Sequence, residues 1–363
     1  MGLITATIII GLYRFSPALA VTAVFGICGI LTCLFYPWWV SRKGSKPGNF
    51  SLAKPSPAEC DLSIVVPAYN EEQRLPIMLK QTIGWLRKNG VNLEIATRQE
   101  NQSPRLSWLR SAEIVVVDDG SKDKTAQVAD SFGVRVISLA QNSGKGEAVK
   151  IGVLAAKGRV ILMADADGAT EFSDLERLYD AGSSVKDRMN IFPEEDSIPS
   201  GISTPSTIDE SLTPATPGNF SAPLNCAVFG SRDHLKSSEA VIERAPIRNF
   251  LMLVFHGLVW LIVGTKIKDT QCGFKLFPRR AAQQIFGSLH LTRWAFDIEV
   301  VEICRRLEIP IIEVPVNWRE IAGSKLNLVT GSLGMLQDMA AVRFLYGIGV
   351  WRVAEKDASK EVD

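Results

Sequence analysis

Short apolar segments of this chain repeatedly end in polar residues and are then followed by a helical pattern. Leu62–Val66, Glu113–Val117 and Val134–Leu139 are such segments, and a fourth apolar run ends in Asp165 and Asp167. Runs of this length are typical of buried strands rather than of independent helices. Repeated strand–helix units form a mostly parallel sheet, and ligands bind such sheets at the carboxyl ends of the strands. The sequence therefore predicts an α/β, Rossmann-like fold with its functional site at that edge.

The two carboxylates at the end of the fourth segment are candidate metal ligands. Asp165 and Asp167 are separated by one residue and followed by Gly168, which permits a tight turn. Paired carboxylates at a strand tip can hold a hard divalent cation that also binds a diphosphate. The same pattern arises by chance in polar loops that cap a strand, so three residues alone leave both interpretations open.

Gly144-Lys145-Gly146 follows the third apolar segment and precedes a helical pattern. It is not a complete phosphate loop, because glycine rather than serine or threonine follows the lysine. It also lacks the third glycine of a dinucleotide-binding fingerprint. We interpret the two glycines as allowing close approach to a nucleotide, with Lys145 supplying charge. The alternative is a turn at a helix start with a solvated lysine.

The first forty residues differ from the rest of the chain in being almost entirely apolar. Ala18–Val40 contains no charged residue, is long enough to cross a bilayer and ends in an aromatic cluster. We predict a membrane anchor at residues 1–40, with a single span at 18–40. A cleaved signal peptide is less consistent with the length of the apolar run. Basic residues are more frequent after the span than before it, which predicts that the remainder faces the cytosol.

The rest of the chain divides by composition. Residues 41–60 read as a linker, 61–326 as the α/β domain, and 327–363 as an amphipathic C-terminal helix with a tail. Two polar stretches, about 97–110 and 183–223, are predicted to be insertions at the surface. The net charge of +1 gives no reason to expect nucleic acid as a partner. Six scattered cysteines indicate neither a disulfide framework nor a zinc site.

Eight segments occur in the order typical of a known family: 63–72, 115–123, 144–146, 163–170, 230–233, 269–277, 293–299 and 316–326. Together they resemble the dolichyl-phosphate β-glucosyltransferases of the endoplasmic reticulum, which are inverting glycosyltransferases of GT-A fold. The resemblance implies transfer of glucose from UDP-glucose to dolichyl phosphate. It also implies an endoplasmic reticulum membrane location with the catalytic domain in the cytosol, and the lipid bilayer as a partner. A homo-oligomer is left open.

The resemblance also implies roles for particular residues. Asp165 and Asp167 would hold Mg²⁺ or Mn²⁺ on the UDP diphosphate. Ala169 stands where related mannosyl-transferring enzymes often have Gln, so no third protein ligand is expected. The residues implied to surround the base and ribose are Pro67, Tyr69, Glu71 and Asp119, beside Gly144 and Lys145.

Further charged residues are implied to position the two phosphate-bearing substrates. Arg232 and Arg248 resemble the phosphate-binding arginines of the family, and Lys275 and Lys325 are additional cationic candidates. Asp297 is either a catalytic base or an acid at a helix N-terminus, where the dipole favours it. Asp269 either orients a basic side chain or closes a turn.

Three other functions remain open at this point. A nucleotidyltransferase would also use a metal at a sheet edge, but it would release pyrophosphate rather than UDP. A dolichyl-phosphate mannosyltransferase-like enzyme would use GDP-mannose as donor. A catalytically dead, membrane-tethered protein would bind the sugar nucleotide without transferring glucose.

Overall fold

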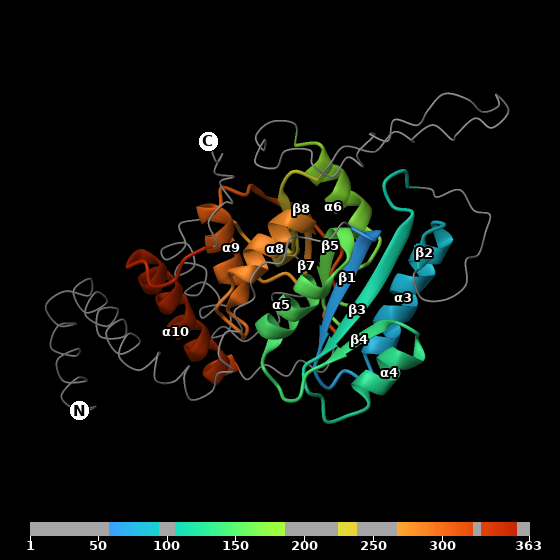
Figure 1. The fold of residues 1–363 in the computed structure, drawn as a ribbon, viewed down its shortest axis with the longest axis horizontal. Coiled ribbons are helices and arrows are strands. Elements are labelled where there is room, and N and C mark those ends of the chain that lie inside the picture. Colours follow the sequence, from blue (N-terminus) through green and yellow to red (C-terminus); the bar gives the residue numbers. More distant parts are fainter. Residues whose placement is uncertain (1–57, 94–105, 186–223, 238–266, 322–327, 354–363) are drawn as a thin grey trace, which may run out of the picture.

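The computed structural model describes residues 58–93, 106–185, 224–237, 267–321 and 328–353, which are coloured in Figure 1. The predicted anchor at 1–40 and most of the linker at 41–60 lie outside these residues, as do Arg248 and Lys325. Within the described part of the chain, no helix has the combined length and apolarity needed to cross a membrane.

A single eight-stranded sheet forms the centre of the molecule, in the order β2-β3-β1-β5-β7-β6-β8, with β4 also paired to β3. The strands are β1 Cys60–Ala68, β2 Asn92–Leu93, β3 Ser111–Asp118, β4 Arg135–Ser138, β5 Gly158–Ala164, β6 Ala227–Ser231, β7 Phe274–Pro278 and β8 Ile311–Pro315. Every strand pair is parallel except the two that β7 makes with β5 and β6. The predicted α/β fold with a mostly parallel sheet is confirmed.

Helices cover both faces of this sheet (Figure 1). They are α3 Leu75–Lys88, α4 Thr125–Ser131, α5 Lys145–Ala155, α6 Asp174–Ser183, α8 Arg279–Gly287, α9 Phe296–Arg306 and α10 Leu328–Gly347, with a 3-10 turn η1 at Asp233–Ser237. Alternate residues of a strand point to opposite faces. Leu62, Ile64 and Val66 of β1 accordingly pack with α3, α4 and α6, whereas Val65 packs with α5, α8, α9 and α10. Two apolar layers therefore hold the sheet.

The predicted polar insertion at 97–110 is wrong in its last residues. Trp108 and Leu109 are buried, and the Trp108 ring stacks on Tyr179 of α6 at 3.7 Å between centroids. A tryptophan ring is a large apolar group whose burial is favourable even in a stretch of polar sequence. The end of this stretch therefore belongs to the core. Similarly, β1 begins at Cys60, inside the predicted linker.

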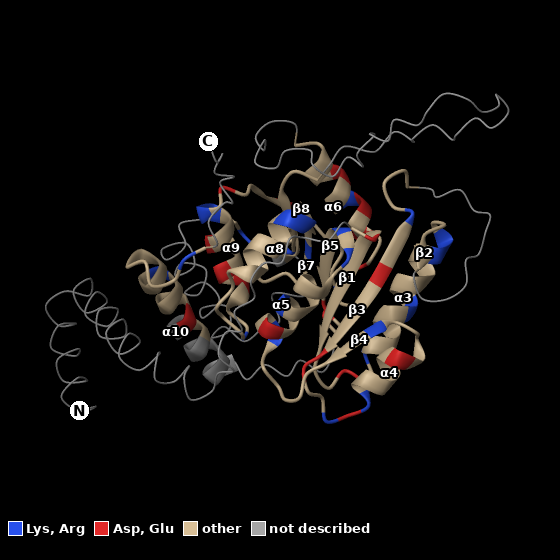
Figure 2. Ribbon diagram, in the orientation of Figure 1, with Lys and Arg blue, Asp and Glu red and all other residues tan. Residues whose placement is uncertain are grey.

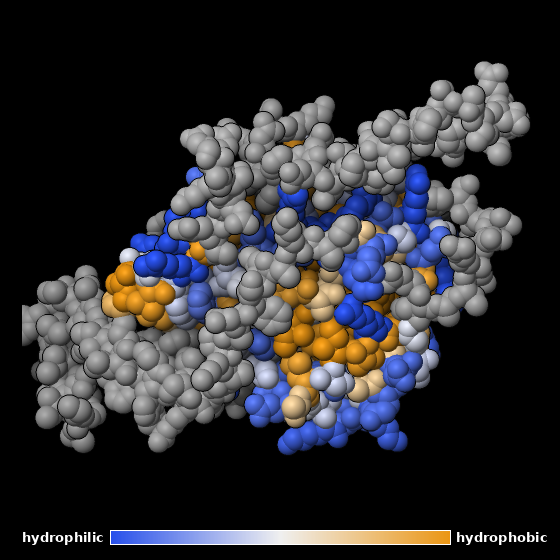
Figure 3. All heavy atoms as spheres, viewed as in Figure 1, coloured by the Kyte–Doolittle hydropathy of each residue, from blue (hydrophilic) through white to orange (hydrophobic). Residues whose placement is uncertain are grey.

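The predicted C-terminal helix is present as α10. Met339, Val342 and Leu345 are buried, whereas Phe344 on the same helix and Ile348 just beyond it are exposed. Figure 3 shows apolar atoms at the exposed end of α10. The buried residues of α10 pack in the same apolar layer as α9. The predicted amphipathic pattern of the whole helix stays a prediction.

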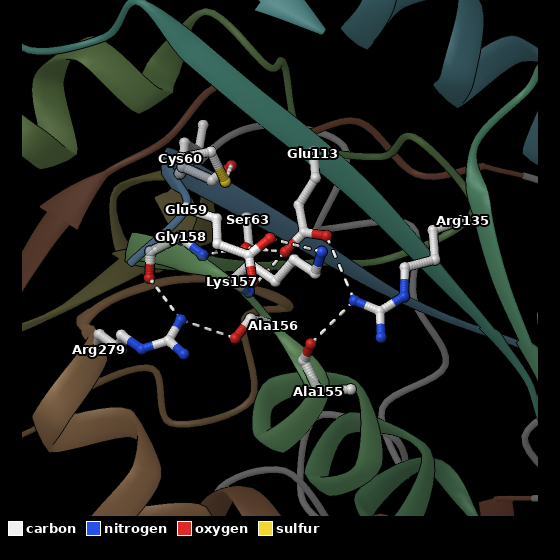
Figure 4. A network of polar contacts seen from close by, with 11 residues as sticks. Glu59, Cys60, Ser63, Glu113, Arg135, Ala155, Ala156, Lys157, Gly158 and Arg279 are labelled. Carbon is white, nitrogen blue, oxygen red and sulfur yellow. Dashed lines mark hydrogen bonds and ion pairs between the residues drawn. The ribbon is translucent and has the colours of Figure 1, made fainter. Parts of the chain in front are cut away.

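The edge of the sheet where the parallel strands begin is fastened by a buried carboxylate (Figure 4). Oε1 of Glu113 accepts hydrogen bonds from the Ser63 hydroxyl at 2.5 Å and from the Lys157 backbone N–H at 2.6 Å. Such bonds satisfy buried donors that would otherwise be costly. They fix the turn between α5 and β5. Helix α5, which begins with Lys145, and strand β5, which precedes Asp165, are consequently held in a fixed arrangement.

Candidate active site

The polar residues predicted at the strand tips do meet at one edge. β1, β3 and β5 are adjacent and parallel, so their following loops emerge side by side. The Asp119 N–H donates to the Ala68 carbonyl at 2.8 Å, which ties the first two loops together. Figure 2 shows acidic and basic residues gathered in these loops, below the sheet in that view. The site is therefore built from segments distant in sequence.

Asp165 is paired with the lysine of the glycine–lysine turn. The Lys145 ammonium lies 2.6 Å from Oδ1 of Asp165 and 5.3 Å from the centre of the Trp294 ring. Burial alone would raise the pKa of the Asp165 carboxyl, but Lys145, helped by Arg232 and Lys275, outweighs burial and lowers it. Asp165 is therefore held as a carboxylate at neutral pH.

Asp167 experiences a different balance of charges. Its Oδ1 accepts the Ala169 N–H at 3.0 Å, which orients the carboxylate at the start of the loop. Burial raises the pKa of Asp167, and the neighbouring charge of Asp165 raises it further. On acidification Asp167 therefore takes up a proton before Asp165 does.

These residues fit a divalent cation. Carboxylate oxygens are the ligands that Mg²⁺ and Mn²⁺ prefer, and Asp165 lies in a cradle that exists because Gly273 has no side chain. Within the described residues, no group of three or more His, Cys, Asp or Glu side chains is placed to hold a metal. Mg²⁺ is commonly held by one or two carboxylates together with substrate phosphates. Asp165 and Asp167 therefore suit a cation shared with a diphosphate.

The glycine–lysine turn is packed against the protein rather than left open. A Cβ on Gly144 would overlap the carbonyl oxygen of Thr292, and one on Gly146 would lie 2.6 Å from that of Leu291. Gly144 also has a φ of 105°, which favours glycine. The close approach that these glycines permit is thus to the Leu291–Thr292 backbone. The turn directs Lys145 at Asp165, and its predicted approach to a nucleotide stays a prediction.

Asp119 holds this same turn in place. Its carboxylate accepts hydrogen bonds from the Ser143 N–H at 2.7 Å, the Gly144 N–H at 2.9 Å and the Asn142 side chain at 2.9 Å. Burial raises the pKa of Asp119, while the two backbone donors oppose that rise. The structure thus assigns Asp119 to the turn. Its predicted contact with base or ribose stays a prediction.

The other residues implied for the nucleoside pocket lie at the end of β1. Pro67 is within β1, and Tyr69 and Glu71 follow it, both half-buried. Glu71 forms an ion pair with Arg74, and its backbone N–H donates to the Thr125 hydroxyl at 2.7 Å. The loops after β1 and β3 are therefore interlocked, which is the arrangement expected of a rigid pocket wall.

Arg232 and Asp269 form a two-pronged ion pair beside the acidic pair. Nε and Nη2 of Arg232 donate to the two carboxylate oxygens of Asp269 at 2.8 and 2.9 Å. The guanidinium also lies 5.4 Å from the centre of the Trp318 ring. Burial would raise the pKa of Asp269, but Arg232 lowers it. The expectation that Asp269 orients a basic side chain is confirmed, and Nη1 is the Arg232 nitrogen left to meet a phosphate.

Lys275 does not position substrates as predicted. Only 1% of its side chain is exposed, and its ammonium donates to the Thr270 carbonyl at 2.7 Å and to Asp297. A cation enclosed in this way cannot reach a bound phosphate. Asp297 is the second residue of α9 and only 5% exposed, and burial raises its pKa despite Lys275 and Lys145. Its position matches the helix N-terminal interpretation, and its role as a base stays a prediction.

A pocket opens next to Asp165 on the side of the sheet covered by α3. Its lining residues are Met78, Gln81, Thr82, Ala164, Asp165, Gly168, Thr170, Phe172 and Phe274. Gly168 keeps a φ of 68° and approaches Met78 closely, so the loop after Asp167 bends towards α3. Asp165 therefore faces both this pocket and Lys145.

Sequence reasoning missed three residues of this site. Gly273 lies against the Asp165 carboxylate, Trp294 flanks Lys145 with 44% of its side chain exposed, and Trp318 lies beside Arg232. All three lie in the segments 269–277, 293–299 and 316–326 that resemble the family, which is the signal the sequence offered. The contact between Gly273 and Asp165 depends on the pairing of β7 with β5, which no local pattern shows.

The chain is similar to known glycosyltransferases. The model of glycosyl transferase family 2 matches residues 63–184, which include Asp165 and Asp167. A dolichyl-phosphate beta-glucosyltransferase of Dictyostelium discoideum is 40% identical over 299 residues, covering 80% of this chain and 76% of that protein. One from Mus musculus is 38% identical over 368 residues, covering 96% and 98%. The crystal structure of glucosyl-3-phosphoglycerate synthase from Mycobacterium tuberculosis with UDP is 15% identical with a TM-score of 0.47, covering 79% and 80%.

The two curated relatives align with most of the chain, far beyond the segment that the family model matches. The mostly parallel sheet with helices on both faces is GT-A-like, as the resemblance implied. The acidic pair lies just beyond the carboxyl end of β5. By sequence identity and coverage, the chain belongs to the dolichyl-phosphate β-glucosyltransferase family.

Proposed function

We propose that this protein transfers glucose from UDP-glucose to dolichyl phosphate with inversion, giving dolichyl β-D-glucosyl phosphate and UDP. The product would serve as a glucose donor for lipid-linked oligosaccharide assembly in protein N-glycosylation. The observation that carries the proposal is the pair Asp165 and Asp167 at the tip of β5, with Lys145 and Arg232 beside it. Family membership supports the choice of donor and acceptor.

The side chains at this edge suit the departure of a nucleoside diphosphate. Asp165 and Asp167 would hold Mg²⁺ or Mn²⁺, which neutralises charge on the leaving UDP without a proton donor. Lys145 is already directed at the same point, and Asp165 raises the pKa of Lys145 enough to outweigh its burial. The lysine thus keeps its positive charge where negative charge accumulates.

The acceptor places fewer demands on the protein. A phosphate monoester has a second pKa of about 6, so dolichyl phosphate is largely a dianion at cytosolic pH and can attack the sugar carbon unaided. A general base is therefore not required, which is compatible with Asp297 being bonded to Lys275. What remains is to hold two anions together, and Arg232 is the described cation best placed for that task.

The direct test is incubation of the purified full-length protein with labelled UDP-glucose and dolichyl phosphate. We expect a glucolipid that is labile to mild acid, together with UDP. Release of pyrophosphate would instead identify a nucleotidyltransferase, and a product from GDP-mannose but not UDP-glucose would identify a mannosyltransferase. Binding of UDP-glucose with no transfer to lipid would identify a catalytically dead binding protein.

Arg232→Ala is expected to raise the KM for dolichyl phosphate by about 10- to 100-fold, because a charge-assisted hydrogen bond to the lipid phosphate is lost. The affinity for UDP should change little. Kinetics with varied acceptor and calorimetry with UDP would measure the two effects. Arg159→Ala is the control, because Arg159 is an exposed arginine that pairs with Asp61 at the opposite edge of the sheet. If the variant instead loses affinity for UDP and keeps normal acceptor kinetics, Arg232 binds a phosphate of UDP rather than the lipid phosphate.

We further propose that the protein is held in the endoplasmic reticulum membrane by a single span at 18–40, with its catalytic domain in the cytosol. The apolar stretch and the basic residues that follow it support this orientation. Asn49, Asn101 and Asn219 each begin an N-glycosylation acceptor sequence. We expect all three to be unmodified in eukaryotic cells, with no mobility shift on glycosidase treatment. An acceptor sequence added before residue 1 is the positive control, because in this orientation it would lie in the lumen and be modified. A glycan on Asn101 or Asn219 would show that the catalytic domain lies in the lumen instead.

A further inference from the structure

Gly273 lies directly across from Asp165 in the sheet. β5 and β7 are antiparallel, with Met163 opposite Lys275 and Ala164 opposite Phe274, so the next position in this register pairs Asp165 with Gly273. Side chains of opposed residues normally stand next to each other on one face of the sheet. At this position one partner has no side chain, and the carboxylate lies over the glycine instead.

The Asp165 carboxylate occupies the position that a side chain on residue 273 would take. A Cβ on Gly273 would lie 2.5 Å from Oδ1 of Asp165 and closer still to Cγ and Oδ2, whereas real Cβ atoms keep at least 3.0 Å. All atoms of the carboxylate therefore occupy the space of the missing side chain. The same carboxylate is held from the other side by Lys145, 2.6 Å from Oδ1.

We propose that Gly273 is a positioning residue for the acidic pair: its missing side chain lets the Asp165 carboxylate lie across β7, where it meets Lys145 and would hold the divalent cation. The proposal rests on the proposed metal-dependent function and adds a residue to it. Gly273 touches neither nucleotide nor sugar in this role. It acts only by setting where Asp165 lies.

The role is steric rather than conformational. Gly273 is not among the glycines with positive φ, so its backbone is one that alanine can also adopt. Gly273→Ala should therefore fold, with the new methyl group displacing the Asp165 side chain rather than the strand. Misplacement of a catalytic group by about 1 Å can cost roughly 100-fold. A loss of that size is expected in the binding that depends on Asp165.

The experiment measures UDP affinity of the full-length protein by calorimetry, with and without Mn²⁺. In the wild type we expect Mn²⁺ to strengthen UDP binding. In Gly273→Ala we expect this Mn²⁺-dependent gain to fall by about 100-fold, while UDP affinity without metal and the thermal unfolding midpoint stay as in the wild type. Binding is read directly, so the result does not depend on turnover.

Two control glycines separate this effect from general strain. A Cβ on Gly182 would overlap Leu224 in the core far from the acidic pair, and a Cβ on Gly84 of α3 would meet nothing within 4 Å. Gly182→Ala should lower the unfolding midpoint but keep the Mn²⁺-dependent gain. Gly84→Ala should keep the Mn²⁺-dependent gain and raise the unfolding midpoint slightly, because alanine is more favourable than glycine inside a helix.

A double-mutant cycle tests whether Gly273 acts through Asp165. Asp165→Asn keeps the shape of the side chain but removes its charge, and it should lower the Mn²⁺-dependent gain to the part that Asp167 supplies. If Gly273 acts only through Asp165, then adding Gly273→Ala to Asp165→Asn causes no further loss. Losses that multiply would overturn the proposal, as would a Gly273→Ala protein that keeps the full gain.

A wild type with no Mn²⁺-dependent gain would remove the metal assignment itself, whereas normal metal-dependent binding without glucosyl transfer would refute only the proposed reaction.

Discussion

Asp165→Asn is expected to abolish glucosyl transfer, lowering kcat by about 1,000-fold or more, while the domain stays folded. Loss of a metal ligand removes several kcal/mol of charge stabilisation at the leaving diphosphate, and about 4 kcal/mol corresponds to 1,000-fold in rate. Asparagine has nearly the shape of aspartate, so the packing against Gly273 is preserved. The expected loss is therefore one of charge rather than of fit.

The measurement is the rate of glucolipid formation at saturating UDP-glucose and dolichyl phosphate, with circular dichroism to check folding. Asp167→Asn should behave similarly, because Asp167 is the other oxygen ligand of the pair. Asp61→Asn is the control: Asp61 pairs with Arg159 at the opposite edge of the sheet, and its loss should leave turnover intact. Near-normal turnover by a folded Asp165→Asn protein would remove Asp165 from the metal site.

The carboxyl edge of the sheet could be predicted because it depends on local patterns. Each of β1, β3 and β5 is a short apolar run followed by polar residues, and parallel strands joined by helices bring such tips together. The sequence pattern therefore predicts that Asp165, Asp167 and Glu71 lie at the same carboxyl edge of the sheet. The physical reason is that chain direction alone decides which end of a parallel strand carries the loop.

The antiparallel strand β7 could not be predicted in the same way. Lys275, the second residue of β7, is predicted from the sequence to be a cation that helps to position the phosphate-bearing substrates. In the structure the lysine is buried because Asp297, far along the chain, supplies its counter-charge. A pattern within one segment carries no information about a partner of this kind.

Packing across distant segments also decided the function of Gly144 and Gly146. Glycine next to lysine at a helix start is typical of phosphate binding, and the sequence offered no sign that Leu291 and Thr292 would lie on these glycines. The Thr292 carbonyl even accepts the Glu147 N–H at 3.1 Å, a donor that a phosphate would otherwise meet. The structure pairs Lys145 with Asp165 and packs its flanking glycines on Leu291 and Thr292, and a local pattern predicts neither contact.

Lys275→Met is expected to lower the free energy of unfolding by about 3–5 kcal/mol, because it leaves the Asp297 carboxylate buried without its counter-ion. Burial already raises the pKa of Asp297, and without Lys275 the pKa in the folded state should rise further. An acid whose folded pKa exceeds its unfolded pKa contributes least to stability at high pH. The deficit of this variant should therefore shrink as the pH is lowered through the folded pKa of Asp297. Denaturant unfolding at several pH values would measure both effects.

The matched variant Lys275→Met with Asp297→Leu removes both charges, and it should recover most of the lost stability, because a buried pair can be replaced by apolar side chains of similar size. Lys268→Met is the surface control: Lys268 is 68% exposed and 3.3 Å from Asp233, and such pairs contribute about 1 kcal/mol or less. A double variant no more stable than Lys275→Met would show that the lysine acts through packing rather than charge. Lys275 lies two residues after Gly273 on the strand beside Asp165, so the ion pair that holds β7 to α9 also holds the surface on which the Asp165 carboxylate lies.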